Sequence, residues 1–225
     1  MRFDRSTGTG SLAAPVLQAF DAVPTAVAPG PAGPLSFVAI SAGANYAGEF
    51  GNGSSSGPHM SPVPGPKLLF STISAGNGFT CGLESGSSAP YCWGQNASGQ
   101  LGNGTTNASL TPVPVGGGKA FKTLSSIRAG LWYACGLTAA GRAYCWGRNN
   151  SGQLGDGSTI DRPLPVAVGG GLTFASLATL GSGDANHTCA IAATTRETYC
   201  WGLNSNGQLG NGTTSGSMTP VKVVP

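Results

Sequence analysis

The stretch Tyr91-Cys92-Trp93-Gly94, followed by Gly99-Gln100-Leu101-Gly102-Asn103-Gly104, decides the fold because the chain repeats it twice. The second copy begins at Tyr144 and the third at Tyr199, so successive copies start 53 and 55 residues apart. A repeat of about this length is typical of solenoids and propellers, in which one unit cannot bury its apolar face without a neighbour. The chain is therefore predicted to be an array of one structural unit.

Each unit contains four short segments with the composition of β-strands. In the third copy they are 172–180, 187–191, 199–201 and 220–223. A polar segment that differs in length and sequence between copies joins the two middle strands, which indicates a β-hairpin with a free tip. The prolines of the last strand restrict it to a sheet edge. Four antiparallel strands in roughly 50 residues predict an all-β fold, a β-propeller of four-stranded blades.

The chain holds about three and a half repeats, so we expect an incomplete propeller. The complete repeats are 67–118, 119–170 and 171–225. Before them, 35–66 matches a repeat that lacks its central strands and both cysteines, although Gly48–Gly53 keeps the Gly-x-x-Gly-Asn-Gly pattern. The Pro- and Ala-rich segment 1–34 resembles the tail of an earlier blade. An open arc of this kind exposes blade edges and is expected to self-associate.

The aromatic residues of the repeated motif are expected to form its packing core. Side chains alternate between the two faces of a strand, so tyrosine and tryptophan point one way and the cysteine between them points the other. Large aromatic side chains dominate core packing, so we expect them to fill the space between blades. The predicted core residues are Trp93, Trp146, Trp201, Tyr91, Tyr144, Tyr199, Leu101, Leu154 and Leu209.

Six cysteines occur as one pair per complete repeat, with 10 or 11 positions between partners. This spacing predicts the disulfides Cys81–Cys92, Cys135–Cys145 and Cys189–Cys200, each across one hairpin. Disulfides persist in oxidising compartments, which favours an extracellular or cell-surface location; a cytoplasmic one is the alternative. A metal site is not expected, because no Cys-x-x-Cys pair is present and the only histidines are His59 and His187.

Composition and motifs argue against several classes of function. Charged residues make up 8% of the chain, the net charge is +3 and no Lys/Arg run is present, so nucleic-acid binding is not expected. No apolar stretch is long enough for a membrane span. A catalytic role for Ser182, Asp184 and His187 is disfavoured because all three fall in one local turn. The Gly99–Gly104 segment lacks the Lys-Ser/Thr ending of a phosphate loop. We therefore expect no enzyme activity and no cofactor.

Together the motifs resemble one known family. The order is Cys-(Gly/Ala)-(Leu/Ile), then Tyr-Cys-Trp-Gly-x-Asn-x-x-Gly-Gln-Leu-Gly-x-Gly, then Pro-Val. This order resembles the repeat of the regulator of chromosome condensation superfamily. The resemblance implies a β-propeller that displays loops on two faces. The paired cysteines make the chain similar to secreted bacterial members and to the ectodomains of plant crinkly-type receptor kinases.

The expected function is that of a non-enzymatic scaffold that binds a protein partner or ligand through loops, since loops carry function on rigid frames. The candidate binding residues lie where the copies differ: Glu84, Asn107, Arg142, Asp161 and Arg162. One alternative is a guanine-nucleotide exchange factor or another intracellular regulator of the same superfamily. A second alternative is a fragment of the sensor ectodomain of a receptor kinase.

Overall fold

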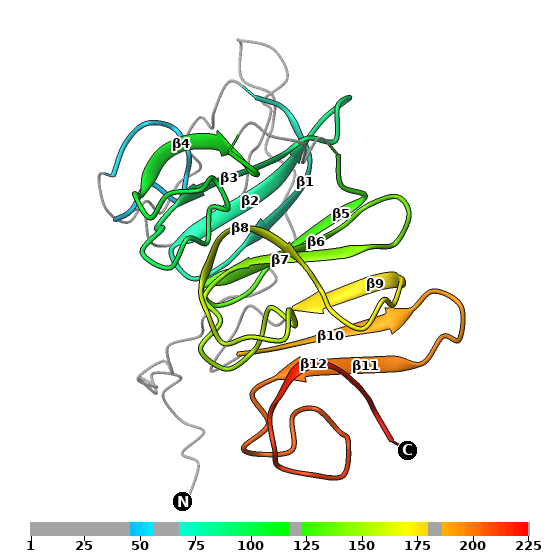
Figure 1. The fold of residues 1–225 in the computed structure, drawn as a ribbon. Coiled ribbons are helices and arrows are strands. Elements are labelled where there is room, and N and C mark those ends of the chain that lie inside the picture. Colours follow the sequence, from blue (N-terminus) through cyan, green and yellow to red (C-terminus); the bar gives the residue numbers. More distant parts are fainter. Residues whose placement is uncertain (1–45, 56–67, 118–122, 180–185, 225) are drawn as a thin grey trace, which may run out of the picture.

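Twelve β-strands form the part of the chain that the structure describes, and no helix occurs in that part. The structure is a computed structural model and describes residues 46–55, 68–117, 123–179 and 186–224. The predicted segment 1–34 lies outside these residues, as does most of the truncated repeat. The predicted all-β architecture is confirmed: the strands form three four-stranded antiparallel sheets, and each sheet lies within one complete repeat (Figure 1).

The sheets, or blades, follow the chain in order, and each strand pairs with the next. The first blade comprises β1 (Phe70–Ala75), β2 (Phe79–Glu84), β3 (Pro90–Gly94) and β4 (Ser109–Pro114). The second comprises β5 (Ser126–Ala129), β6 (Tyr133–Leu137), β7 (Ala143–Gly147) and β8 (Arg162–Ala167). The third comprises β9 (Phe174–Thr179), β10 (His187–Ala192), β11 (Thr198–Gly202) and β12 (Ser217–Lys222).

The fourth strand of each blade lies at a sheet edge, as its prolines predict. Its start was predicted wrongly, however: β12 begins at Ser217 and not at Pro220, and β4 begins likewise at Ser109. The register of β3 against β4 shifts between Cys92 and Gly94, and this irregularity lets Gly94 pair with Ser109. The extra pairing lies ahead of the prolines, where the backbone can still donate hydrogen bonds.

The blades stack face to face, each sheet lying against the next one along the chain (Figure 1). The first strands of neighbouring blades are in direct contact: the backbone N–H of Ala129 donates to Ser74 Oγ at 2.9 Å. A backbone bond of 3.1 Å from Asn77 to the Leu131 carbonyl also joins the first two blades. The described strands therefore form an arc of three blades.

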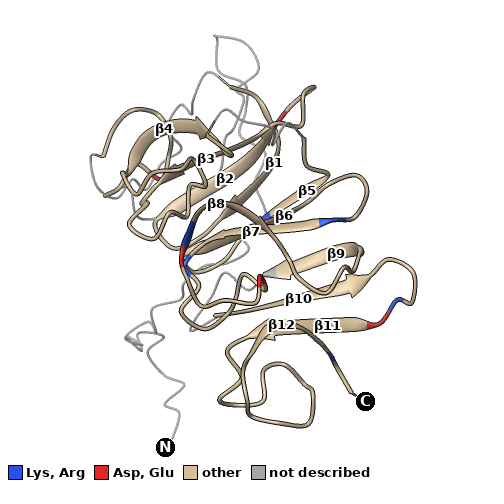
Figure 2. Ribbon diagram, viewed as in Figure 1, with Lys and Arg blue, Asp and Glu red and all other residues tan. Residues whose placement is uncertain are grey.

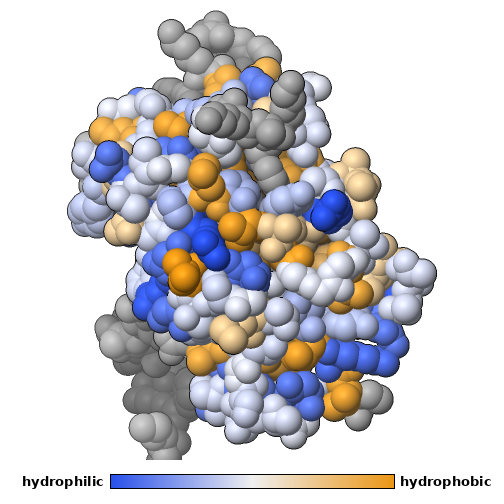
Figure 3. Space-filling model, in the orientation of Figure 1, coloured by the Kyte–Doolittle hydropathy of each residue, from blue (hydrophilic) through white to orange (hydrophobic). Residues whose placement is uncertain are grey.

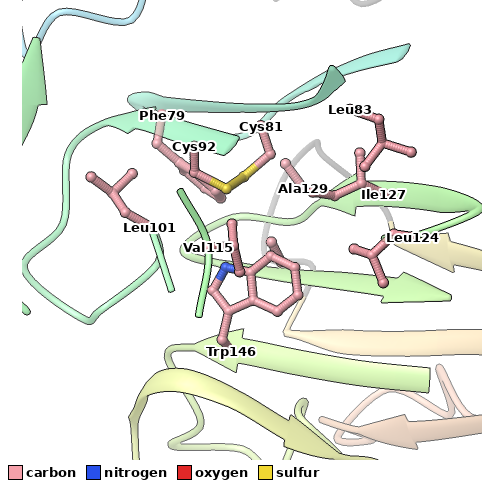
Figure 4. Packing of buried hydrophobic residues seen from close by; sticks show 11 residues of the cluster. Phe79, Cys81, Leu83, Cys92, Leu101, Val115, Leu124, Ile127, Ala129 and Trp146 are labelled. Carbon is pink, nitrogen blue, oxygen red and sulfur yellow. A yellow bond between two sulfur atoms is a disulfide. The ribbon is translucent and has the colours of Figure 1, made fainter. Parts of the chain in front are cut away.

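The main core lies between blades, and its two sides are different. We call the face of a blade that bears the tryptophan its leading face and the face that bears the disulfide its trailing face. Figure 4 shows the Cys81–Cys92 disulfide and Leu83 of the first blade opposite Trp146 and Ile127 of the second. The same arrangement recurs between the second and third blades, where Trp201 belongs to the cluster that contains Cys135 and Cys145.

Three disulfides clip the central hairpins, with the pairing that the spacing predicts. In each case the two cysteines are directly opposite one another across the hairpin, with Cα atoms 4.0 or 4.1 Å apart. Each bond closes a loop of 10 or 11 residues. A loop of that size is worth a little under ~3 kcal/mol by the chain-entropy estimate.

Candidate binding surface

Each tryptophan of the repeated motif is held by a loop of the preceding repeat. The indole N–H of Trp146 donates to the Gln100 carbonyl at 3.0 Å, and that of Trp201 donates to the Gln153 carbonyl at 2.9 Å. All three motif tryptophans are fully buried. We call the carbonyl of the Gly-Gln-Leu-Gly loop, together with its second glycine, the indole socket. The socket satisfies the one polar group of a buried ring and fixes the distance between blades.

The second glycine of the loop is required because the indole lies directly against it. A Cβ atom at Gly102 would stand 2.7 Å from Trp146, and one at Gly155 would stand 2.7 Å from Trp201. Both glycines also have positive φ, 65° and 70°. A side chain would clash with the ring and strain the backbone, so only glycine fits. The repeated glycines are thus explained by packing between blades.

Residues 46–55, the described part of the predicted truncated repeat, form a socket like those of the complete repeats. Trp93 donates to the Glu49 carbonyl at 2.7 Å, and Gly51 lies against its ring. Phe50 is 6% exposed and occupies the place of Leu101. The Glu49 carboxylate accepts the backbone N–H of Ala47 at 2.9 Å, as the Gln100 side chain accepts that of Ser98. Residues 48–53 therefore fill the same role as the complete loops.

A buried asparagine organises the long connection after each tryptophan. The Asn96 side chain accepts the Leu101 N–H at 2.9 Å, and its amide donates to the carbonyls of Thr105 and Asn107 at 3.0 and 2.9 Å. Asn149 and Asn204 make the equivalent bonds in their own blades. These asparagines were part of the repeated motif, yet sequence reasoning gave them no role. They make the connections rigid frames for the residues at their surface.

The predicted binding residues fall at two opposite ends of the blades. Glu84 and Arg142 lie at the β2–β3 and β6–β7 hairpins, which we call the hairpin end. The other three, Asn107, Asp161 and Arg162, lie in or directly after the long connections 95–108 and 148–161, at the loop end. Figure 1 shows the two ends on opposite sides of the arc. No single surface therefore gathers all five residues.

Three of the predicted side chains are engaged within their own connections. Arg162 forms a 2.9 Å ion pair with Asp156, whose side chain is 6% exposed. Burial by itself would raise the pKa of Asp156, but hydrogen bonds from Ser158, Arg162 and Asn149 outweigh it and lower that pKa. Asp161 accepts the Asn149 N–H at 2.7 Å. At the hairpin end the Ser87 hydroxyl donates to the Glu84 carboxylate. The side chains of Asn107 and Arg142 are exposed.

Sequence reasoning missed a Trp–Arg pair at the loop end. The Arg148 guanidinium lies over the Trp132 ring, 4.4 Å from its centroid, and both residues are half-buried. A backbone bond of 2.9 Å from Arg148 to the Trp132 carbonyl holds the two together. The equivalent positions carry Gly78 with Gln95 in the first blade and Asn186 with Leu203 in the third. The sequence signal that could have identified this pair is that these two positions of the repeat carry different residues in each copy.

A polar contact also crosses the boundary between the second and third blades. The Tyr133 hydroxyl donates to the His187 carbonyl at 2.6 Å, and Thr188 Oγ1 lies 3.0 Å from both that hydroxyl and the Gln153 carbonyl. Burial raises the pKa of Tyr133, and the Thr188 bond opposes this rise. The buried Nδ1 of His187 has no hydrogen-bond partner among the described residues. Burial lowers the pKa of His187.

Charged residues are sparse on the described ribbon and lie mainly near strand ends and in loops (Figure 2). The surface seen in Figure 3 mixes apolar and polar residues. The exposed apolar side chains of the described residues include Leu110, Ile160 and Leu164, at 37%, 62% and 46% exposure. Within the described ranges no group of three or more His, Cys, Asp or Glu side chains could hold a metal ion. The same ranges contain no helix of the length and hydropathy that crossing a membrane requires.

Curated proteins with similar sequences are much longer than this chain. Human E3 ubiquitin-protein ligase HERC2 is 38% identical over 135 residues, which are 58% of this chain and 3% of that protein. The ultraviolet-B receptor UVR8 of Arabidopsis thaliana is 29% identical over 188 residues, or 78% of this chain and 40% of the receptor. The chain therefore spans less than half of either relative.

Solved structures share the fold. Prp20p of Saccharomyces cerevisiae superimposes with a TM-score of 0.59 at 21% identity, covering 73% of this chain and 40% of that one. Yeast RCC1 (Prp20) in its complex with Kap60 gives 0.58 at 20% identity, covering 75% and 41%. The model of the regulator of chromosome condensation (RCC1) repeat matches residues 91–137, 140–191 and 197–225. The chain therefore belongs to the RCC1 repeat family, as several repeats of a partial β-propeller.

Proposed function

We propose that this chain is a non-enzymatic scaffold that binds a protein through the loop end of its blades. The observation that carries the proposal is the Trp132–Arg148 pair, which lies half-buried at the surface of a rigid frame. Tryptophan and arginine are the residue types most enriched among interface hot spots. The loop end also holds Asn107, Asp161 and Arg162, which remain candidate contacts around this pair.

The long connections at the loop end support this role because hydrogen bonds and an ion pair within each connection hold it rigid. The buried asparagines and the Asp156–Arg162 pair hold the loops in place before any partner arrives. Binding to a preorganised surface loses less conformational entropy than binding to a mobile one. The yeast protein Prp20 (RCC1), which shares the fold, has been solved in complex with Kap60 and studied for its binding to Gsp1p and histones, so protein binding by this fold has a precedent.

The proposed location is an oxidising compartment, because three native disulfides clip the blades. The cytoplasm remains the alternative. Alkylation of free thiols in intact source cells, followed by mass spectrometry of the six cysteines, decides between them. Blocked cysteines support the first location, and six labelled thiols would contradict it.

The binding proposal is tested with three variants of the purified chain. Trp132→Ala and Arg148→Ala remove the pair at the loop end, and Arg142→Ala is the matched control at the hairpin end. Proteins retained by the unaltered chain are quantified against each variant, and the dissociation constant is then measured with the purified partner. We expect the loop-end variants to bind about tenfold or more weakly, which is ~1.4 kcal/mol. A loss confined to Arg142→Ala would move the site to the hairpin end and contradict the proposal.

The exchange-factor alternative has its own assay. The unaltered chain is added to a panel of nucleotide-loaded small GTPases, and nucleotide release is followed with time. Accelerated release would establish the alternative, and Trp132→Ala would show whether that activity uses the same surface.

A further inference from the structure

The trailing face of the third blade carries an indole socket that no described residue fills. Its loop, residues 207–212, has the same internal bonds as the others: the Gly210 N–H donates to the Gly207 carbonyl at 3.0 Å, and Asn204 accepts the Leu209 N–H. The three buried indole N–H groups are already bound to Glu49, Gln100 and Gln153. The carbonyl of Gln208 is therefore a socket without its ring among the described residues.

The surroundings of the glycines in this loop also show that no described blade packs against it. A Cβ atom at Gly99 or Gly152 would meet the backbone of the following blade at 2.5 or 2.9 Å. At Gly207 it would meet nothing within 4 Å. At Gly210 it would meet only Val223 of its own blade, whereas at Gly102 and Gly155 it would meet a tryptophan.

The strand residues of this face are uncharged, and the strands place Ile191 between Ser176 and Thr198 of the neighbouring strands. Ile191 lies two residues after Cys189, as Leu83 and Leu137 follow the cysteines of their blades, but it is 37% exposed whereas they are 2% and 3% exposed. Val221 pairs with Cys200 as Val113 pairs with Cys92. We call the residues Cys189, Ile191, Cys200, Val221 and Val223, with the 207–212 loop, the open face.

The complementary face exists at the other end of the same chain. The leading face of the first blade presents Phe70, Ile73 and Tyr91 around Trp93. All three are half-buried. The residues of the second blade that correspond to Phe70 and Ile73 are Leu124 and Ile127, which are only 2% and 0% exposed. Among the described residues outside the first blade, the loop 48–53 covers Trp93, and no described sheet lies beyond that loop.

We infer that the open face of the third blade binds the leading face of the first blade of a second copy of this chain. The 207–212 loop of one copy takes the place of residues 48–53 of the other and receives its Trp93. Each of the three filled sockets in the chain makes this same contact with a tryptophan, which is why a tryptophan-bearing blade is the occupant. The contact is head-to-tail, so it continues past a dimer until the rotation closes.

The chain's own 48–53 loop competes with this contact. A tethered loop acts at an effective concentration of millimolar order, so it outcompetes a second copy in dilute solution. Association is therefore expected to be weak in the unaltered chain and to strengthen when the loop is displaced. Gly51→Val displaces it, because the added side chain would stand 2.8 Å from the Trp93 ring nitrogen at a φ of +68°.

Sedimentation equilibrium of the full chain, with its disulfides intact, tests the inference. Gly51→Val is expected to raise the association constant by about tenfold or more. Adding Ile191→Glu to Gly51→Val places a charge on the open face and is expected to return the protein to a monomer. Adding Ile160→Glu instead, at a site that is 62% exposed on a loop, is the matched control and should leave association unchanged. The inference would be overturned if both the unaltered chain and Gly51→Val were monomers. It would also be overturned if assembly stopped at an open dimer, joined by one contact, or if assembly persisted with Ile191→Glu.

Hydrogen exchange on the unaltered chain gives a second readout that needs no variant. As concentration rises, amides of 207–212 should gain protection while those of 48–53 lose it, because the two loops exchange places on Trp93. A rise in mass without this reciprocal change would overturn the head-to-tail arrangement.

Discussion

The boundary between the second and third blades and the open face of the third blade share one sequence pattern but differ in environment. At the boundary, Leu137 and Cys135 are buried against Phe174, Leu177 and Trp201. On the open face the equivalent Ile191 is more than ten times as exposed, at 37% against 3%. Burial in a repeat protein therefore depends on the neighbouring unit, because one blade cannot cover its own apolar face.

Removing a tryptophan from a filled boundary is the largest test of this comparison. Trp146→Ala removes a fully buried ring and leaves the Gln100 carbonyl without its donor, so we expect a loss of about 3–5 kcal/mol in the free energy of unfolding. Urea unfolding with the disulfides intact measures it. Trp132→Ala at the surface is the control and should cost far less. Equal losses for the two variants would refute the proposed boundary.

The same position in two blades gives a sharper test. Leu137→Ala is expected to lower the free energy of unfolding by about 2–5 kcal/mol, because the side chain is enclosed between blades. Ile191→Ala removes the same number of carbon atoms as Leu137→Ala, yet should cost roughly 1 kcal/mol, because about a third of the Ile191 side chain is already exposed to solvent. The measurement is urea unfolding at a concentration where the chain is monomeric. A cost at Ile191 that matches Leu137 would mean that the open face is covered.

The three disulfides should differ in their reduction. Cys189 is half-buried on the open face, whereas both cysteines of the other two pairs are fully buried. Thiol exchange requires access to sulfur, so a small dithiol should reduce Cys189–Cys200 first under native conditions. That loss removes a constraint worth a little under ~3 kcal/mol. Timed alkylation with mass spectrometry measures the order, and earlier reduction of either buried pair would contradict it.

The smallest expected effect is a dependence of stability on pH. Burial lowers the pKa of His187, so the folded state binds its proton less tightly than the unfolded state. The stability contributed by neutral His187 is complete above the unfolded pKa of about 6.5, falls as pH drops below it, and levels off below the folded pKa. Because the ring is partly solvated, the change should be under ~1 kcal/mol.

His187→Phe introduces the residue found at the equivalent Phe79 and should remove this part of the pH dependence. Thermal unfolding between pH 5 and 8 compares the two proteins. An identical slope in both would show that other groups cause it.

The repeated motif was sufficient to predict much of the architecture. The positions of the cysteines within Tyr-Cys-Trp-Gly indicated hairpins and cross-strand pairs, and the prolines indicated edge strands, because these inferences need only local geometry. The likeness of Gly48–Gly53 to the other glycine-rich loops was also visible in the sequence, and residues 48–53 make the same contact with a tryptophan. By contrast, the strand starts at Ser109 and Ser217 depend on a shift in register, which local composition does not encode.

The candidate site was harder to predict. Arg162 was identified as a variable residue, but its partner Asp156 is visible only when the connection is folded. The Trp132–Arg148 pair joins residues 16 positions apart on two strand ends, and their contact depends on the backbone bond between those ends. Variation between copies can mark such positions, but it cannot show which side chains are engaged.

By itself the sequence determined the unit: its four strands, its cross-strand disulfides and the tryptophan that each unit contributes. Those features follow from side-chain alternation, turn chemistry and spacing within about 50 residues. Only the tertiary structure decided which loop binds which tryptophan, and that the last loop remains unfilled among the described residues. The physical reason is that an indole N–H and its carbonyl acceptor lie 44 to 48 residues apart, and only the packing of one blade on the next brings them together.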